Sequence, residues 1–142
     1  MKQTAATVAQ NLAQCLLALE VDANNSSNVH AALSVLEKLR LNLAKPLGAA
    51  GFQALLVRAL ALAKSEVEWL NDVEVKSNGT LAGFDDNARS RAEEAVFGGA
   101  ALLSELLALL MIFIGEALTL QLLHNIWSEI PWERNSNVEE IL

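Results

Sequence analysis

The sequence predicts an all-α protein, a bundle of about five helices that carries one small β-hairpin. Hydrophobic residues make up 53 % of the 142 residues, whereas aromatic residues make up only 5 %. Only two prolines and seven glycines interrupt the chain, and aliphatic residues recur three or four positions apart over most of its length. Together these observations favour aliphatic helix packing over a β-sandwich or barrel. The length is that of a single domain, which we assign to residues 1–132, followed by a polar tail at residues 133–142.

The first two helices are expected on either side of a short polar linker. Apolar residues recur at helical spacing from Thr4 to Glu20, which predicts an amphipathic helix. Turn and capping residues fill positions 22–28, and Asn28 is placed to cap a second helix. Because Pro46 disfavours helical geometry at the residue before it, we expect the second helix to end near Ala44. The two helices are predicted to form an antiparallel hairpin.

A third helix and the β-hairpin follow. Apolar residues again recur at helical spacing from Phe52 to Leu70. Residues 73–76 then alternate between apolar and charged, Asn78-Gly79 is a turn signal, and residues 81–84 complete the pattern of a small β-hairpin near residues 73–84. Isolated hairpins are only marginally stable, so this one is expected to pack against the helices.

The last third of the chain is its most apolar part. Residues 85–87 are expected to cap a helix. Gly98-Gly99 either kinks or interrupts this helix, or allows another helix to pack closely against it. Residues 100–127 are apolar on nearly all sides, until Pro131 stops any helix. Whether residues 88–127 form one kinked helix or two is left open. Such a segment is either the centre of a bundle or buried against a second copy, and we expect both, in a symmetric dimer.

The charge distribution disfavours nucleic acid and a membrane span. The net charge is −7 with a pI near 4.7, which argues against a phosphate-binding surface. Glu105 and Glu116 interrupt the apolar C-terminal segment, and no cluster of Lys or Arg flanks it. The single Cys15 and the absence of an apolar leader near Lys2 indicate a cytoplasmic protein.

Three glutamates are spaced by eleven residues in the last third, at Glu94, Glu105 and Glu116. On a continuous helix this spacing would place them in one stripe. The stripe is either a buried carboxylate pair suited to acid–base or metal chemistry, or a solvated face with structural ion pairs. We favour the second interpretation, because a di-metal bundle needs a Glu-x-x-His pair on each of two helices and the chain has none.

Few groups in the sequence support catalysis, and no catalytic residue, metal site or cofactor is predicted. His30 and His124 lie in separate segments, and no His, Lys or Arg lies near Cys15 in the sequence to activate its thiol. Glycine-rich phosphate loops, nucleophile elbows and Cys-x-x-Cys motifs are absent from the sequence. The best candidate ligand set is Glu105, Glu116 and His124, because Glu116 and His124 would project from neighbouring faces of one helix.

The three tryptophans, Trp69, Trp127 and Trp132, each lie near the end of an expected element. We expect them to close the bundle, each with its indole N–H on an acceptor, while Trp132 has the further possibility of anchoring a partner protein. The candidate interface residues are Leu109, Ile112, Phe113, Trp127 and Trp132.

Three segments carry a resemblance to a known family: residues 51–64 (GFQALLVRALALAK), residues 78–83 (NGTLAG) and residues 113–120 (FIGEALTL). Over residues 51–127 the chain resembles an uncharacterised family of small bacterial proteins. The resemblance implies a bacterial origin and a helical fold. It implies no site residue, since no activity, cofactor or ligand is known for the family.

The function favoured by these observations is a non-catalytic regulatory or adaptor module. It would bind another protein and form a homodimer through its apolar C-terminal helix, because apolar surface is abundant and catalytic groups are missing. One alternative is a ligand-binding or enzymatic bundle in which Glu105, Glu116 and His124 surround an internal pocket. Another alternative is peripheral membrane association through residues 106–123.

Overall fold

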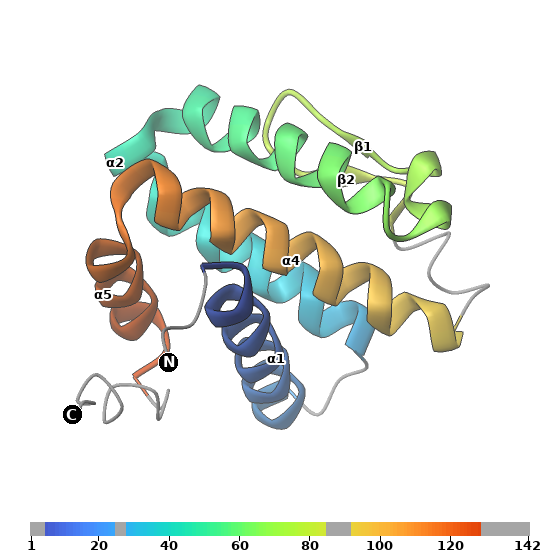
Figure 1. Cartoon of the computed structure of the whole chain (residues 1–142), viewed down its shortest axis with the longest axis horizontal. Coiled ribbons are helices and arrows are strands. Elements are labelled where there is room, and N and C mark those ends of the chain that lie inside the picture. Colours follow the sequence, from blue (N-terminus) through green and yellow to red (C-terminus); the bar gives the residue numbers. More distant parts are fainter. Residues whose placement is uncertain (1–4, 25–27, 85–91, 129–142) are drawn as a thin grey trace.

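The computed structural model of the chain describes residues 5–24, 28–84 and 92–128, and these residues are mostly helical. Four α-helices are present in these ranges: α1 (Ala5–Asn24), α2 (Asn28–Lys64), α4 (Ala92–Ile114) and α5 (Glu116–Ile126). A 3₁₀ turn, η1 (Glu68–Asp72), and two short strands, β1 (Glu74–Val75) and β2 (Leu81–Ala82), lie between α2 and α4 (Figure 1). The predicted all-α character with one small hairpin is therefore confirmed, whereas the predicted count of about five helices is not.

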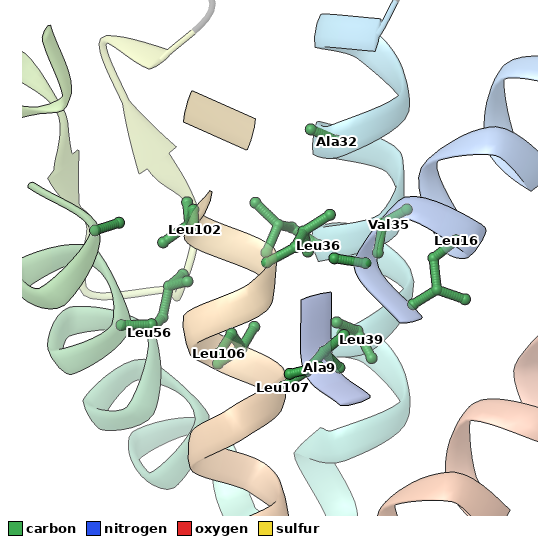
Figure 2. Packing of buried hydrophobic residues seen from close by; sticks show 14 of the residues in the cluster. Ala9, Leu16, Ala32, Val35, Leu36, Leu39, Leu56, Leu102, Leu106 and Leu107 are labelled. Carbon is green, nitrogen blue, oxygen red and sulfur yellow. The ribbon is translucent and has the colours of Figure 1, made fainter. Parts of the chain in front are cut away.

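Helix α2 accounts for part of that difference. The prediction that a helix ends near Ala44 is wrong: helical hydrogen bonding continues past Pro46, and the chain bends at Gly48, where φ is 80° and ψ is 157°. This combination is accessible to glycine and strained for other residues, so the bend falls on Gly48 rather than on the residue before the proline. The segments of α2 before and after Gly48 lie on either side of α4 (Figures 1 and 2).

Helix α4 is at the centre of the molecule and contacts α1, α2 and α5. Its inward side chains Leu102, Leu106 and Leu107 are fully buried. Figure 2 shows them between Leu56, from the second segment of α2, and Leu39, from the first segment. The expectation that the apolar C-terminal segment supplies the central helix is met by this arrangement, because a helix with apolar residues on nearly all sides must be surrounded by other elements.

Two glycines in α4 allow a close approach to its neighbours instead of interrupting it. A Cβ atom on Gly98 would lie 2.3 Å from Cζ2 of Trp69, and one on Gly99 would lie 3.0 Å from Cβ of Ala32. The possibility that Gly98-Gly99 kinks the helix is therefore wrong, and close packing is the correct alternative. The break falls at Gly115, where φ is 94° and ψ is 152°, so two helices are formed.

The hairpin follows the sequence pattern closely. β1 and β2 pair antiparallel, with Glu74 opposite Ala82 and Val75 opposite Leu81. Gly79 has a φ of 85°, and the side-chain oxygen of Asn78 accepts hydrogen bonds from the backbone N–H and the hydroxyl of Thr80. These bonds give the Asn-Gly turn its shape. The predicted caps at residues 85–87, Trp132 and the tail at residues 133–142 lie outside the described residues.

Candidate functional site

An exposed apolar corner lies where α4 meets α5. Ile112 and Phe113 at the end of α4 are 75 % and 65 % exposed, and Leu118 in α5 is 46 % exposed. We refer to these three residues as the apolar corner. Gly115 sits between them, and its carbonyl accepts hydrogen bonds from the backbone N–H of Thr119 at 3.1 Å and from its hydroxyl at 2.8 Å. These bonds start α5 directly after the bend. Ile112, Phe113 and Leu118 all lie within three residues of Gly115 in the sequence.

A buried carboxylate joins three helical elements beneath the surface. Glu20 of α1 is only 1 % exposed. Its Oε1 accepts a hydrogen bond from the Ser34 hydroxyl at 2.7 Å, and its Oε2 accepts one from the Trp127 indole N–H at 2.7 Å and one from the Lys38 ammonium. The Lys38 nitrogen also lies 5.8 Å from the Trp127 ring centroid, within cation–π range. This network ties the residue after α5 to α1 and α2.

The same network sets the ionisation of Glu20. Burial by itself would raise the pKa of this carboxyl, but the hydrogen bonds from Lys38, Trp127 and Ser34 outweigh it, so the pKa lies below its ordinary value. Glu20 is therefore a carboxylate at neutral pH, and both of its oxygens accept hydrogen bonds. Such a group is suited to holding helices together rather than to exchanging protons.

A surface groove runs between α1, α4 and η1. It consists of two adjoining hollows of about 660 and 550 Å³, which share Glu66, Val67 and Phe97. Phe97 is 68 % exposed. We refer to the two hollows together as the acidic groove. The other described residues that line it are Gln10, Asn11, Gln14, Glu68, Trp69, Asn71, Asp72, Ala100, Ala101, Ser104 and Glu105.

Two glutamates come together in the acidic groove. Burial raises the pKa of the Glu105 carboxyl, and the hydrogen-bonding contact with Glu66 and the charge of Glu66 raise it further. The pKa of Glu105 is therefore raised, and this carboxyl keeps its proton to a higher pH than a solvated glutamate does. A cation bound beside these two carboxyl groups would favour the charged form of Glu105.

The predicted ligand residues do not gather in this groove. Glu105 lines it, but neither Glu116 nor His124 is among its described lining residues. Glu116 is exposed in the first turn of α5, and His124 is half-buried in the last turn of the same helix. The bend at Gly115 ends α4 before Glu116, so the eleven-residue spacing does not produce a stripe on one continuous helix. Within the described ranges, no three His, Cys, Asp or Glu side chains are grouped as a metal ion would require.

The predicted interface residues divide in a similar way. Ile112 and Phe113 are exposed at the apolar corner, and Leu109 is half-buried. Trp127 is 3 % exposed and donates its indole N–H to Glu20, as expected for a tryptophan that closes the bundle. Its side chain is therefore not part of the exposed surface around Phe113.

Sequence reasoning missed Glu20, Glu66 and Phe97. Glu20 is the one charged residue on the apolar side of the first predicted helix, which is a usable signal for a buried ion pair. Glu66 and Phe97 lie at helical positions that also fit a structural role, and no spacing in the sequence relates them to each other. Only the packing of α4 against the end of α2 brings them to one groove.

Two described segments are long and apolar enough to cross a membrane, judged by length and composition. One comprises residues 30–64 and contains the bend at Gly48, and the other is Phe97–Ile114 in α4, half of which is buried inside the chain. Core helices of soluble proteins pass the same test.

Comparison with protein families, with characterised proteins and with solved structures found no match for this chain. The resemblance of residues 51–127 to an uncharacterised bacterial family therefore stays an expectation.

Proposed function

We propose that the protein is a non-catalytic adaptor module of the cytoplasm, which self-associates as a homodimer through the apolar corner. The observation that carries this proposal is the exposure of Ile112 and Phe113, at 75 % and 65 %, at the end of the central helix α4. Large apolar side chains that lie together on a surface are typical of protein interfaces. Aromatic side chains in particular contribute strongly when they become buried on association.

The shape of the corner also suits a symmetric contact. The chain bends at Gly115 between α4 and α5, and a Cβ atom on Gly115 would meet nothing within 4 Å. A second copy can therefore approach the backbone closely at this point. In a two-fold dimer each Phe113 would pack against the corner of the other protomer.

The experiment is a mass measurement by size-exclusion chromatography with light scattering on detergent-free protein. At about 100 μM, well above a micromolar dissociation constant, the wild-type chain is expected to elute as a dimer. The variant Ile112→Ser/Phe113→Ser should elute as a monomer and keep the helical circular dichroism spectrum of the wild type, because both side chains are exposed in the single chain.

A matched control removes two exposed apolar side chains at another place on the surface. Leu41 and Val57 of α2 are 61 % and 46 % exposed and lie outside the apolar corner. The variant Leu41→Ser/Val57→Ser should remain a dimer. A monomeric wild-type protein, or equal dissociation of both double variants, would overturn the proposal, and recovery of the protein only in detergent would favour membrane association instead.

A further inference from the structure

The acidic groove is a second surface with the features of a binding site, and it is separate from the apolar corner. Four of its described lining residues are acidic, Glu66, Glu68, Asp72 and Glu105, and none of the described lining residues is Lys, Arg or His. Opposite charge across an interface steers partners together and discriminates against the wrong ones. The charge of the groove therefore calls for a cationic partner.

An exposed aromatic ring lies at the junction of the two hollows. Phe97 is 68 % exposed and belongs to both hollows, and Ala100 and Ala101 follow it on the same face of α4. An ammonium or guanidinium group can sit over such a ring, while its aliphatic stem covers small apolar neighbours. Phe97 thus adds an apolar contact that a bare inorganic cation would not use.

Amide side chains from α1 form one wall of the groove. Gln10, Asn11 and Gln14 line it from α1, and all three are exposed. No hydrogen bond within the described part of the chain occupies their side-chain amides. A primary amide both donates and accepts, so this wall matches the N–H and C=O groups of an extended peptide backbone.

The length of the groove supports the same occupant. From Phe97 to Glu105, the lining face of α4 covers eight residue steps, or about 12 Å at the rise of an α-helix. An extended chain advances about 3.3 Å per residue, so about four residues fit along this face.

We propose that the acidic groove binds an extended, basic segment of a partner protein, whose lysine or arginine side chains lie over Phe97 and against Glu66 and Glu105. The amide wall of α1 hydrogen-bonds the backbone of the segment. This inference adds a partner of defined chemistry to the adaptor role, and it does not depend on dimerisation through the apolar corner.

The test uses the full-length protein and fluorescence anisotropy of a labelled peptide in which lysine and alanine alternate. Wild-type protein should bind this peptide saturably and should not bind the matched peptide with glutamate in place of lysine. Glu66→Gln/Glu105→Gln should weaken binding about tenfold, and Phe97→Ala, which removes an exposed side chain, should weaken it about fivefold.

Controls separate the groove from general attraction to an acidic protein. Glu74→Gln/Glu116→Gln has the same net charge as the groove variant, but both positions are exposed elsewhere, so its affinity should change less than about twofold. Ile112→Ser/Phe113→Ser should also retain binding, which keeps this test independent of the dimer. Circular dichroism melting of every variant confirms that it is folded.

Three results would overturn the proposal. The first is the absence of saturable binding by the wild-type protein. The second is an equal loss of affinity in the two glutamine double variants, or no loss in Phe97→Ala. The third is displacement of the peptide by an equimolar amount of the free triamine spermidine, which would make the groove a site for small cations.

Discussion

At the residue scale, Glu20 is a buried carboxylate that accepts three hydrogen bonds from side chains. Burying an isolated carboxylate is costly, but here a serine hydroxyl, an indole N–H and an ammonium group all donate to it. Lys38 keeps 43 % of its side chain exposed, so the ammonium group retains water on one side. The charge of Glu20 is therefore compensated without burying a second full charge.

Replacing Glu20 tests this account. We expect Glu20→Gln to lower the free energy of unfolding at neutral pH by about 1–3 kcal/mol, because a charge-assisted acceptor is lost from three donors. The measurement is urea denaturation followed by circular dichroism. Glu37→Gln is the control: this exposed glutamate pairs only with Arg40 among the described residues, so its loss should cost less than about 1 kcal/mol.

The pH dependence of the same variant has a defined sign. The pKa of Glu20 is lower in the folded chain than in the unfolded chain. The stability that Glu20 contributes is therefore fully present at a pH above its pKa in the unfolded chain. It is lost as the pH falls through its pKa in the folded chain. The difference between wild type and Glu20→Gln should therefore shrink on acidification. A difference that stays constant from about pH 7 to pH 3 would contradict this role.

The sequence predicted the role of Trp127 in the Glu20 network. The position of Trp127 at the end of an apolar segment indicated an indole N–H that closes the bundle on an acceptor. The acceptor itself could not be predicted, because Glu20 lies 107 residues away. Which polar groups meet across such a distance depends on how three helices pack.

At the scale of elements, the decisive question is where long helices bend. Gly48, Gly51, Gly98 and Gly115 all lie in or beside apolar helical segments, and Pro46 is a further candidate. Gly48 and Gly115 have positive φ and mark the bends, whereas Gly98 is helical and lies against Trp69. Local pattern cannot separate these cases, because a glycine required for backbone freedom and a glycine required for close packing look the same in one sequence.

Two neighbouring glycines of α2 provide a matched pair for this scale. A Cβ atom on Gly48 would meet nothing within 4 Å, so the cost of Gly48→Ala is the backbone strain at φ 80° alone, and we expect a loss of about 1–3 kcal/mol in unfolding free energy. Gly51 is helical, and its Cβ would be 3.4 Å from Cβ of Leu47, an ordinary contact. Gly51→Ala should therefore be neutral or stabilise the protein by up to about 1 kcal/mol.

Thermal and urea unfolding of the two variants check this prediction. If Gly48→Ala were as stable as Gly51→Ala, the bend in α2 would not depend on the positive φ of Gly48. The change of direction that places the two segments of α2 on either side of α4 would then have another cause.

At the scale of the whole molecule, α4 is the element on which the others depend. It contacts α1, both segments of α2 and α5, while the hairpin contacts mainly α2. Elements that are surrounded on all sides open only when the whole chain unfolds, whereas peripheral elements open locally.

Hydrogen–deuterium exchange measures this hierarchy. The amides of residues 102–110 should exchange with a free energy equal to that of global unfolding. Those of α5 should exchange at about 1–2 kcal/mol less, since only Thr119 and Leu123 are buried within this helix. Urea denaturation under the same conditions supplies the global value. Equal protection of α5 and α4 would contradict the peripheral position of α5.

The amino-acid sequence by itself determined the helical class, the Asn-Gly hairpin and the central role of the apolar C-terminal segment. These features follow from periodicity, turn chemistry and composition, which act over a few residues. Only the tertiary structure decided that Gly48 and Gly115 are the bends, that Glu20 is the buried acceptor and that Glu66, Phe97 and Glu105 share one groove. These features depend on contacts between residues far apart in the chain, and such contacts arise from how the helices fit together rather than from any local pattern.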